Sequence, residues 1–240
     1  MKLLFDVGNT RIKWGLSKGG EIAESGAFFA SELKEFCAQV SKSKCGEVGT
    51  ISISSVAGLG LRDEIAAWSR DSLGLVPYIA NVEREVAGVR VSYDNLANLG
   101  VDRWLAMIAA WQRCRSECIV ISAGTAITVD YLGHTGHHGG GLIVPGVNLM
   151  RRVLFDRTNA VKVDAFKLLD AWAPGADTIP CVKNGIAAMV KGFIGEVCGS
   201  GFESLPVFLS GGDAKSLSVW LESRAEVAPH LVLEGLMCVS

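Results

Sequence analysis

Residues that could hold a phosphate group gather near the start of the chain, in the stretch LLFDVGNTRIKW at residues 3–14. An apolar run ends on Asp6, a Gly-Asn-Thr turn follows, and alternating residues resume, which predicts two strands joined by a tight turn. Gly8 has no Cβ, so a ligand can approach its backbone closely. An acid at a strand end can hold a hydrated Mg²⁺, while turn amides with hydroxyl, amide and basic neighbours can bind phosphate. An ordinary hairpin with a surface aspartate is the alternative.

A second hairpin of the same kind opens the second half of the chain, in CIVISAGTAITVD at residues 118–130. Aligning Gly8 with Gly124 sets Asp6 against Ser122. Neither hairpin leads into a helix, as a dinucleotide fingerprint or a Walker loop requires, so those two phosphate-binding motifs are excluded. The repetition predicts a gene duplication, with a nucleotide held in the cleft between two similar α/β halves, residues 1–114 and 115–240.

The elements that must position these hairpins alternate along the chain in the manner of layered α/β domains. In the first half we expect strands at 21–29, 50–56 and 75–80, and helices at 31–40, 61–73 and 102–113. In the second half we expect a Gly-rich bend at 137–141, a strand at 142–146, one or two helices between 153 and 188, a helix at 185–198, a strand at 206–210, and a final helix before an apolar end.

Asp102 begins an Ala-rich apolar helix directly after Gly100. This position leaves two interpretations open, a functional carboxylate and a helix cap. Capping the helix is the simpler alternative, because an acid at this position accepts bonds from free backbone amides.

Composition narrows the classes of function. The chain has 240 residues, 49% of them hydrophobic and 20% charged, with a net charge of -2, which is typical of a folded globular protein. Such a charge gives no basic footprint for nucleic acid. We see no secretory signal and no apolar run of membrane-spanning length, so we expect a cytoplasmic protein without membrane contact. The cysteines lack metal-ligand spacing and are expected to be reduced; they lie at positions 37, 45, 114, 118, 181, 198 and 238.

Three other residues have types that suggest chemistry. His137 and His138 resemble metal ligands, but no Cys or acid stands at a fitting offset, so a solvated turn before the glycines is the expected setting. Trp104 follows Arg103 and could line a substrate pocket or pack in the core. The sequence leaves the role of Trp104 open.

Taken together, the motifs resemble the type III pantothenate kinases, members of the acetate and sugar kinase, Hsp70 and actin superfamily. The matching pieces span almost the whole chain: DVGNT at 6–10, Tyr93, LGVDR at 99–103, GTAITVD at 124–130, GGGLIVPG at 139–146, ADT at 176–178 and LSGGDA at 209–214. The resemblance implies a duplicated ribonuclease H-like (actin-like ATPase) α/β fold and a homodimer. It also implies ATP-dependent phosphorylation of pantothenate, the first step of coenzyme A synthesis.

The resemblance also implies roles for individual residues. The ATP site would comprise Asp6, Val7, Gly8, Asn9, Thr10, Arg11, Ile12, Lys13 and Thr125 at the phosphates, with Gly211 and Gly212 near the adenosine. Pantothenate would be bound by Tyr93, Gly100, Val101, Asp102 and Arg103, and by Thr178 of the partner subunit. Asp102 would orient the primary hydroxyl of the substrate and accept its proton. Because a helix N-terminus favours the charged form of the acid, positioning would be the larger part of this role. Asp6 would lie near Mg²⁺.

One position departs from the family pattern. The family usually has Asp where this chain has Ser122, and that Asp binds the activating monovalent cation, K⁺ or NH₄⁺. Serine offers an oxygen without charge, which a desolvated cation accepts poorly. Either the cation dependence is altered or catalysis has decayed, and the persistence of Asp6, Asp102, Arg103 and Thr125 favours an active enzyme. The alternatives are a regulatory protein like the related Bvg accessory factors, or a phosphotransferase for another hydroxylated substrate, which Tyr93 and LGVDR argue against.

Overall fold

In a computed structural model of the chain, residues 1–44, 46–156 and 173–240 are described, and they form two compact units. Unit 1 consists of Met1–Gln112 together with His230–Ser240, and unit 2 consists of Arg113–Pro229. The sequence analysis assigned residues 230–240 to the second half, whereas the helix they form packs on the sheet of unit 1. Within the described ranges, no helix is both long and apolar enough to cross a membrane.

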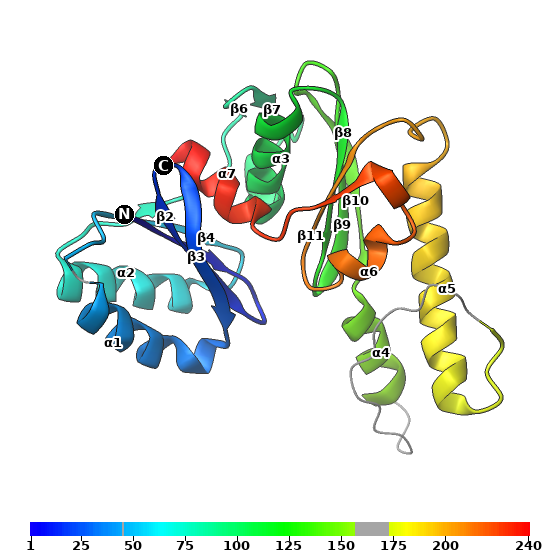
Figure 1. Ribbon diagram of the computed structural model, residues 1–240, viewed down its shortest axis with the longest axis horizontal. Helices are drawn as coiled ribbons and strands as arrows, with labels where there is room; N and C mark the ends of the chain where they lie inside the picture. Colours follow the sequence, from blue (N-terminus) through cyan, green and yellow to red (C-terminus); the bar gives the residue numbers. More distant parts are fainter. Residues whose placement is uncertain (45, 157–172) are drawn as a thin grey trace. The chain divides into compact units, whose positions relative to one another are not determined.

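The sheet of unit 1 has the strand order β3-β2-β1-β4-β5 (Figure 1). Its strands are β1 (Lys2–Val7), β2 (Ile12–Lys18), β3 (Glu21–Phe28), β4 (Thr50–Ser55) and β5 (Tyr78–Ile79). The first three are antiparallel neighbours, and β4 and β5 then run parallel to β1. The ends of β1 and β4 therefore meet at one edge of the sheet, which is where Asp6 lies.

Helices cover both faces of this sheet. On one face lie α1 (Leu33–Ser43), which follows the short helix η1 (Ala30–Glu32), and α2 (Leu59–Leu73) (Figure 1). On the other face α7 (Leu231–Val239) packs on β1 and β4, and α3 (Val101–Cys114) packs against α7. The chain between β5 and α3 contains the small hairpin β6 (Glu85–Val86) and β7 (Val89–Arg90), and the helix η2 (Leu96–Asn98).

Alternation along β1 decides which side chains meet which helices. Leu3, Phe5 and Val7 belong to the core formed with α1 and α2. Leu4 and Asp6 therefore point to the opposite face, toward α7 and α3. The strand thus places the Asp6 carboxylate on the face of the sheet that α7 and α3 cover.

Unit 2 repeats the topology of unit 1, because its sheet has the order β10-β9-β8-β11-β12 with the same parallel and antiparallel pairs. Its strands are β8 (Cys118–Ala123), β9 (Ala126–Leu132), β10 (His138–Pro145), β11 (Val207–Ser210) and β12 (Ala225–Val227). Its helices are α4 (Val147–Asp156), α5 (Thr178–Cys198), α6 (Ala214–Ser218) and η3 (Glu222–Arg224). Asp6 and Ser122 occupy the same position in the two sheets, the penultimate residue of the first strand. The duplication is confirmed.

Most of the predicted elements are confirmed within a few residues, including the two hairpins and the helix that begins near Asp102. The predicted Gly-rich bend at 137–141 is wrong in part, because β10 already begins at His138 and carries a bulge between His138 and Gly141. Gly140 has a φ of 108°, a left-handed conformation that only glycine adopts easily, so three glycines in a row mark a bulge within a strand here. The helices predicted between 153 and 188 fall partly outside the described residues.

Contact between α3 and α7 requires a glycine at position 235, and this yields a stability test. A Cβ on Gly235 would lie 2.0 Å from the carbonyl oxygen of Leu105. We expect Gly235→Ala to lower the free energy of unfolding by about 3 kcal/mol, because the backbone of one helix must move. The control Gly60→Ala, in open space on α2, should leave stability unchanged or raise it by up to about 1 kcal/mol. Urea unfolding followed by tryptophan fluorescence measures both, and equal effects would contradict the close packing.

Candidate active site

Asp6 is a buried carboxylate at the end of β1, with only 7% of its surface exposed. Burial raises its pKa to about 6, the nearby Lys13 ammonium lowers it, and the Asp102 carboxylate raises it. Lys13 Nζ lies 3.9 Å from Asp6 Oδ2, and the two residues face each other in the β1–β2 register. Asp6 is therefore a desolvated acid whose charge is only partly compensated, and a bound cation would stabilise its ionised form.

The turn after β1 presents its polar groups to solvent. The amide of Gly8 donates to the carbonyl of Arg11 over 3.1 Å, which closes the turn. Asn9, Thr10 and Arg11 are exposed, and the Arg11 guanidinium lies 4.7 Å from the ring centroid of Phe29. This stacking holds the turn beside the end of β3. Exposed amides, a hydroxyl and two basic side chains make the turn suitable for an anionic ligand.

The start of α3 holds a second carboxylate on the same face of unit 1. Asp102 is half-buried, and its Oδ1 accepts a bond from the amide of Arg103 over 2.9 Å. A Cβ on Gly100 would lie 2.6 Å from the same oxygen, so glycine leaves room for this side chain. Asp102 thus serves partly as the helix cap that the simpler interpretation requires, and its carboxylate also raises the pKa of Asp6 by repulsion.

Tyr93 and Arg103, which the sequence separates by ten positions, are brought together. The Arg103 Nη1 atom donates to Tyr93 Oη over 3.2 Å. Arg103 is a buried cation and Val101 beside it is buried too, whereas Tyr93 is half-buried at the edge of the unit. A buried guanidinium that bonds a half-buried tyrosine hydroxyl can bind an anionic group of a small molecule.

Ser54 is a residue of this site that the sequence analysis did not single out. It pairs with Asp6 in the β1–β4 register and is fully buried. Among the described residues, none hydrogen-bonds the Ser54 hydroxyl. A buried polar group without a partner calls for an explanation, and a ligand or ordered water bound at the Asp6 edge would supply one. The only signal in the sequence was that TISISSV ends in small hydroxyl residues.

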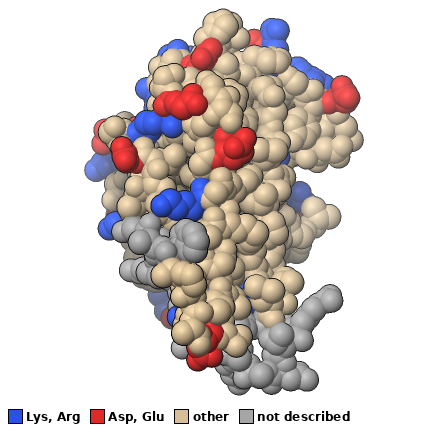
Figure 2. Space-filling view, turned by 90° about the vertical axis from the view of Figure 1, so that its right-hand side faces the viewer, with Lys and Arg blue, Asp and Glu red and all other residues tan. Residues whose placement is uncertain are grey.

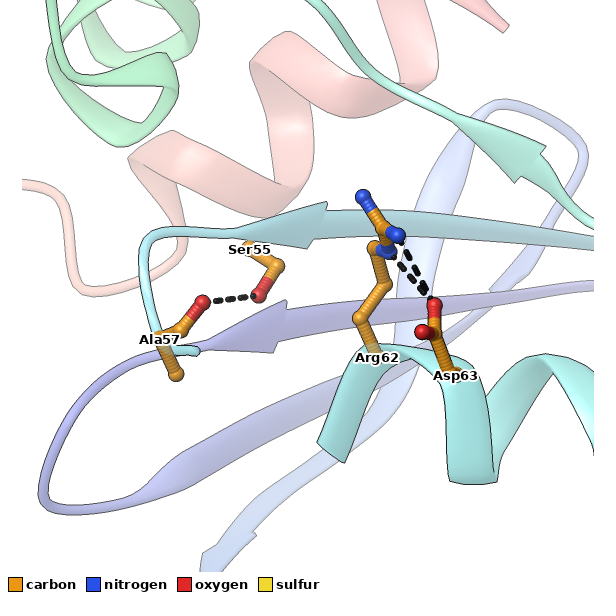
Figure 3. A network of polar contacts seen from close by, with 4 residues as sticks. All are labelled: Ser55, Ala57, Arg62 and Asp63. Atoms are coloured by element: carbon orange, nitrogen blue, oxygen red, sulfur yellow. Dashed lines mark hydrogen bonds and ion pairs between the residues drawn. The ribbon is translucent and has the colours of Figure 1, made fainter. Parts of the chain in front are cut away.

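The loop after β4 completes this edge (Figure 3). The amides of Val56 and Ala57 both donate to the carbonyl of Val7, over 3.1 and 3.3 Å, and Ser55 Oγ donates to the carbonyl of Ala57 over 3.4 Å. On the first turns of α2, Arg62 donates two bonds to its neighbour Asp63. The end of β1 is therefore held by main-chain bonds.

In unit 2 the second hairpin is built from close main-chain contacts. Gly124 and Thr125 are exposed at its turn, and the Thr125 carbonyl accepts a bond from the amide of Gly146 over 2.9 Å. A Cβ on Gly211 would lie 2.2 Å from the carbonyl oxygen of Ala123, and its φ is 93°, so only glycine fits there. Gly212, by contrast, is exposed with open space around it, as a flat ligand would need.

The structure shows what Ser122 contacts. Its Oγ lies 2.9 Å from Ser210 Oγ on the neighbouring strand β11, and Thr128 stands opposite it on β9. Two neutral hydroxyls that bond each other satisfy part of their own hydrogen-bonding capacity. This position therefore lacks the carboxylate that would attract a desolvated cation.

His138 does not lie in a solvated turn, so that prediction is wrong. It is fully buried, and its Nε2 lies 2.9 Å from Oδ1 of the buried Asp130. The antiparallel pairing of β9 with β10 supplies the acid that spacing along the sequence did not reveal. His137 is exposed, as expected, and Trp104 is a core residue with no exposed surface.

The predicted residues thus fall into two groups. Unit 1 brings together Asp6, the turn at 8–11, Lys13, Tyr93 and the start of α3, and unit 2 holds Thr125, Gly211, Gly212 and Thr178. Thr178 is exposed as the first residue of α5, where Asp177 caps the helix by accepting its amide over 2.7 Å. Within the described residues, no three His, Cys, Asp or Glu side chains form a metal-binding group. Mg²⁺ would suit this site, since one or two carboxylates plus substrate phosphates hold it.

Two similar α/β units with this strand order define the fold of the actin-like ATPases and sugar kinases. Over 99% of this chain and 92% of the other, the fold is similar to that of a 2-hydroxyisocaproyl-CoA dehydratase activator from Clostridium difficile, solved with bound ADPNP (TM-score 0.53, 10% identity). A Campylobacter jejuni protein described as a Baf family transcriptional activator is similar with a TM-score of 0.61 and 18% identity, over 97% of this chain and 94% of that one.

Sequence comparison narrows the class to one family. The model of the type III pantothenate kinase family matches residues 2–199. A type III pantothenate kinase from Teredinibacter turnerae is 34% identical over 99% of this chain and 97% of its own length, and one from Pseudomonas putida is 34% identical over 98% and 97%. The chain belongs to the type III pantothenate kinase family.

The raised pKa of Asp6 makes stability depend on pH. The unfolded chain loses this proton near the ordinary pKa of 3.8 and the folded chain near 6, so the folded state binds more protons between these values and stability falls as pH rises through them. At pH 8 the cost is about 3 kcal/mol. We expect Asp6→Asn to raise the free energy of unfolding at pH 8 by up to that amount, and by less than about 1 kcal/mol at pH 4.

Urea unfolding at the two pH values measures this difference. The control is Asp63→Asn, because Asp63 is an exposed carboxylate on α2 in the same unit. Its effect should be small at both pH values. An Asp6→Asn effect that is the same at pH 4 and pH 8 would show that the carboxylate is not desolvated.

Proposed function

We propose that this chain transfers the γ-phosphoryl group of ATP to the primary hydroxyl of pantothenate, the first step of coenzyme A synthesis. Membership of the type III pantothenate kinase family supports the reaction and both substrates. The observation that carries the proposal is the pair of carboxylates on one face of unit 1: a desolvated Asp6 at the end of β1, and Asp102 at the start of α3. Phosphoryl transfer needs alignment and charge stabilisation more than covalent chemistry, and this pair suits both needs.

Asp6 is the proposed ligand of Mg²⁺, and the cation would neutralise charge on the phosphates when bound. The site fits a cation on two counts: the carboxylate is desolvated and only partly compensated by the Lys13 ammonium 3.9 Å away, and the neighbouring Ser54 hydroxyl is buried without a partner among the described residues. Around it, the phosphates of ATP would be bound by the first turn and by Thr125, with Gly211 and Gly212 near the adenosine. The proposed residues of the first turn are Asp6, Val7, Gly8, Asn9, Thr10, Arg11, Ile12 and Lys13.

Pantothenate is proposed to bind at the start of α3. Tyr93, Gly100, Val101 and Arg103 would bind it, and Asp102 would orient the attacking hydroxyl and accept its proton. The bond from Asp102 Oδ1 to the Arg103 amide keeps this carboxylate in one orientation, which favours positioning. Because the helix start stabilises its charge, Asp102 acts as a weak base that receives the proton late, as the new O–P bond forms.

We further propose a homodimer in which Thr178 of the partner subunit completes the pantothenate site. Exposed apolar side chains in unit 2 support it. Leu142 and Ile143 are exposed on β10, which among the described strands lies at the edge of its sheet. Nearby, α4 and α5 pack against each other and expose further large apolar side chains: Leu149, Val153, Leu154 and Met189. An exposed apolar edge strand is a common place for chains to associate.

The cytoplasm is the proposed location, since the described cysteines are all free thiols, as in a reducing compartment. A regulatory, DNA-contacting role is the alternative, and it gains little support. On the face drawn in Figure 2, basic and acidic side chains are scattered among uncharged ones and form no basic stripe.

Removal of the Asp102 charge tests the reaction. We expect Asp102→Asn to lower kcat for pantothenate-dependent ADP formation by a factor of about 10² to 10⁴, because orientation and proton acceptance are both lost. A coupled assay with ATP and Mg²⁺ measures it.

Run in sodium, potassium and ammonium salts, the assay should show turnover that depends little on the monovalent cation, because Ser122 bonds Ser210 and carries no charge. No turnover by the folded wild-type protein in any salt would reject the kinase and favour the regulatory role.

A charge placed on the edge strand tests the dimer. We expect Ile143→Lys to shift the molar mass in multi-angle light scattering from dimer to monomer, because a buried ammonium in an apolar interface is costly. Pantothenate turnover should fall with it, since Thr178 of the partner is then missing. Val76→Lys is the control, because Val76 is an even more exposed apolar residue in unit 1. A wild-type monomer with full activity would contradict the proposal.

A further inference from the structure

We infer that Arg84 is a positioning residue for the pantothenate site, because its guanidinium holds the chain segment that carries Tyr93. The inference rests on the proposed function and adds to it a residue outside the family motifs quoted above. Arg84 precedes the β6–β7 hairpin, and the segment from Val91 to Asp94 follows that hairpin.

Among the described residues, the hydrogen bonds of the Arg84 guanidinium all go to main-chain oxygens of this segment. Its Nη1 donates to the carbonyl of Tyr93 over 2.7 Å and to that of Val91 over 3.3 Å, and its Nη2 donates to the carbonyl of Asp94 over 3.4 Å. A planar guanidinium presents its donors in a fixed fork, so one side chain can span three carbonyls. The shortest bond falls on the residue whose hydroxyl meets Arg103.

The backbone of Arg84 is fixed relative to the same segment. Its carbonyl accepts a bond from the amide of Val91 over 3.0 Å, just beyond the β6–β7 pairs. At the tip of the hairpin, Gln112 Nε2 donates to the carbonyl of Ala87 over 2.6 Å. Gln112 lies on α3, the helix that begins with the predicted pantothenate residues. The Gln112 bond therefore holds the hairpin against α3, and the Arg84 bond to the Tyr93 carbonyl holds Tyr93 against the hairpin.

The Tyr93 segment depends on the hydrogen bonds from Arg84 because few of its side chains are buried. Val91 at its start is buried, and the next buried residue is Leu99, whereas Ser92, Asp94, Asn95, Ala97 and Asn98 between these two are exposed. Segments with few buried apolar contacts open locally at low free-energy cost. Loss of the guanidinium should thus loosen the Tyr93 segment without unfolding unit 1.

Steady-state kinetics on two Arg84 variants test this. Arg84→Ala should raise KM for pantothenate about tenfold, as expected for lost bonds to a charged donor, while kcat and KM for ATP change less than about twofold. Arg84→Lys should keep most of the defect, because one ammonium retains the charge and cannot span three carbonyls. The matched control is Arg90→Ala in the same hairpin, because the exposed Arg90 pairs with Glu85 and should leave KM unchanged.

Hydrogen exchange of peptides covering residues 91–99 supplies a readout that does not need activity. Exchange should be faster in Arg84→Ala and Arg84→Lys, and unchanged in Arg90→Ala. The inference is overturned if exchange stays at the wild-type rate, if Arg84→Lys restores KM, or if KM for ATP rises as much as KM for pantothenate. If the wild-type protein does not phosphorylate pantothenate, the proposed function fails, while the exchange rates still decide whether Arg84 holds the segment.

Discussion

Burial of the Asp6 carboxylate is the constraint on which the rest of the site depends. Alternation along β1 sends its apolar neighbours into the core beneath α1 and α2 and leaves Asp6 on the face of α7 and α3. There burial raises its pKa, the Lys13 ammonium 3.9 Å away lowers it in part, and the Asp102 carboxylate raises it further by repulsion. Such a group lowers the stability of the protein at neutral pH, and the proposed role of Asp6 as a cation ligand would account for its presence.

Glycines allow the close approaches that position the other groups. Gly100 leaves room for the Asp102 carboxylate, Gly235 allows α7 to touch α3, and Gly211 lets the chain after β11 pass the end of β8. At each of these positions a Cβ would lie within 3 Å of a neighbouring oxygen. Within each unit, close backbone contacts therefore position the predicted site residues as much as polar side chains do.

The two halves share a topology and differ in chemistry. Equivalent positions at the end of the first strand hold a buried acid in unit 1 and a hydroxyl paired with Ser210 in unit 2. Unit 2 instead buries its acid one strand further on, where Asp130 bonds His138. The two sheets share one strand order, because strand pairing depends on main-chain hydrogen bonds. The side chains at equivalent strand positions differ, because these hydrogen bonds do not require particular side chains.

The sequence by itself determined the two phosphate-loop-like hairpins, most of the longer strands and helices, and the acid at the start of α3, because hydrophobic periodicity and turn residues are local signals. It did not predict the short strands β6, β7 and β12. With the family resemblance, these were enough to predict the duplicated fold. Only the tertiary structure decided which distant residues meet: Ser54 beside Asp6, Arg84 on the Tyr93 segment, Asp130 on His138, and Ser210 on Ser122. These pairs depend on strand register and on the path of a loop, which spacing along the chain does not encode.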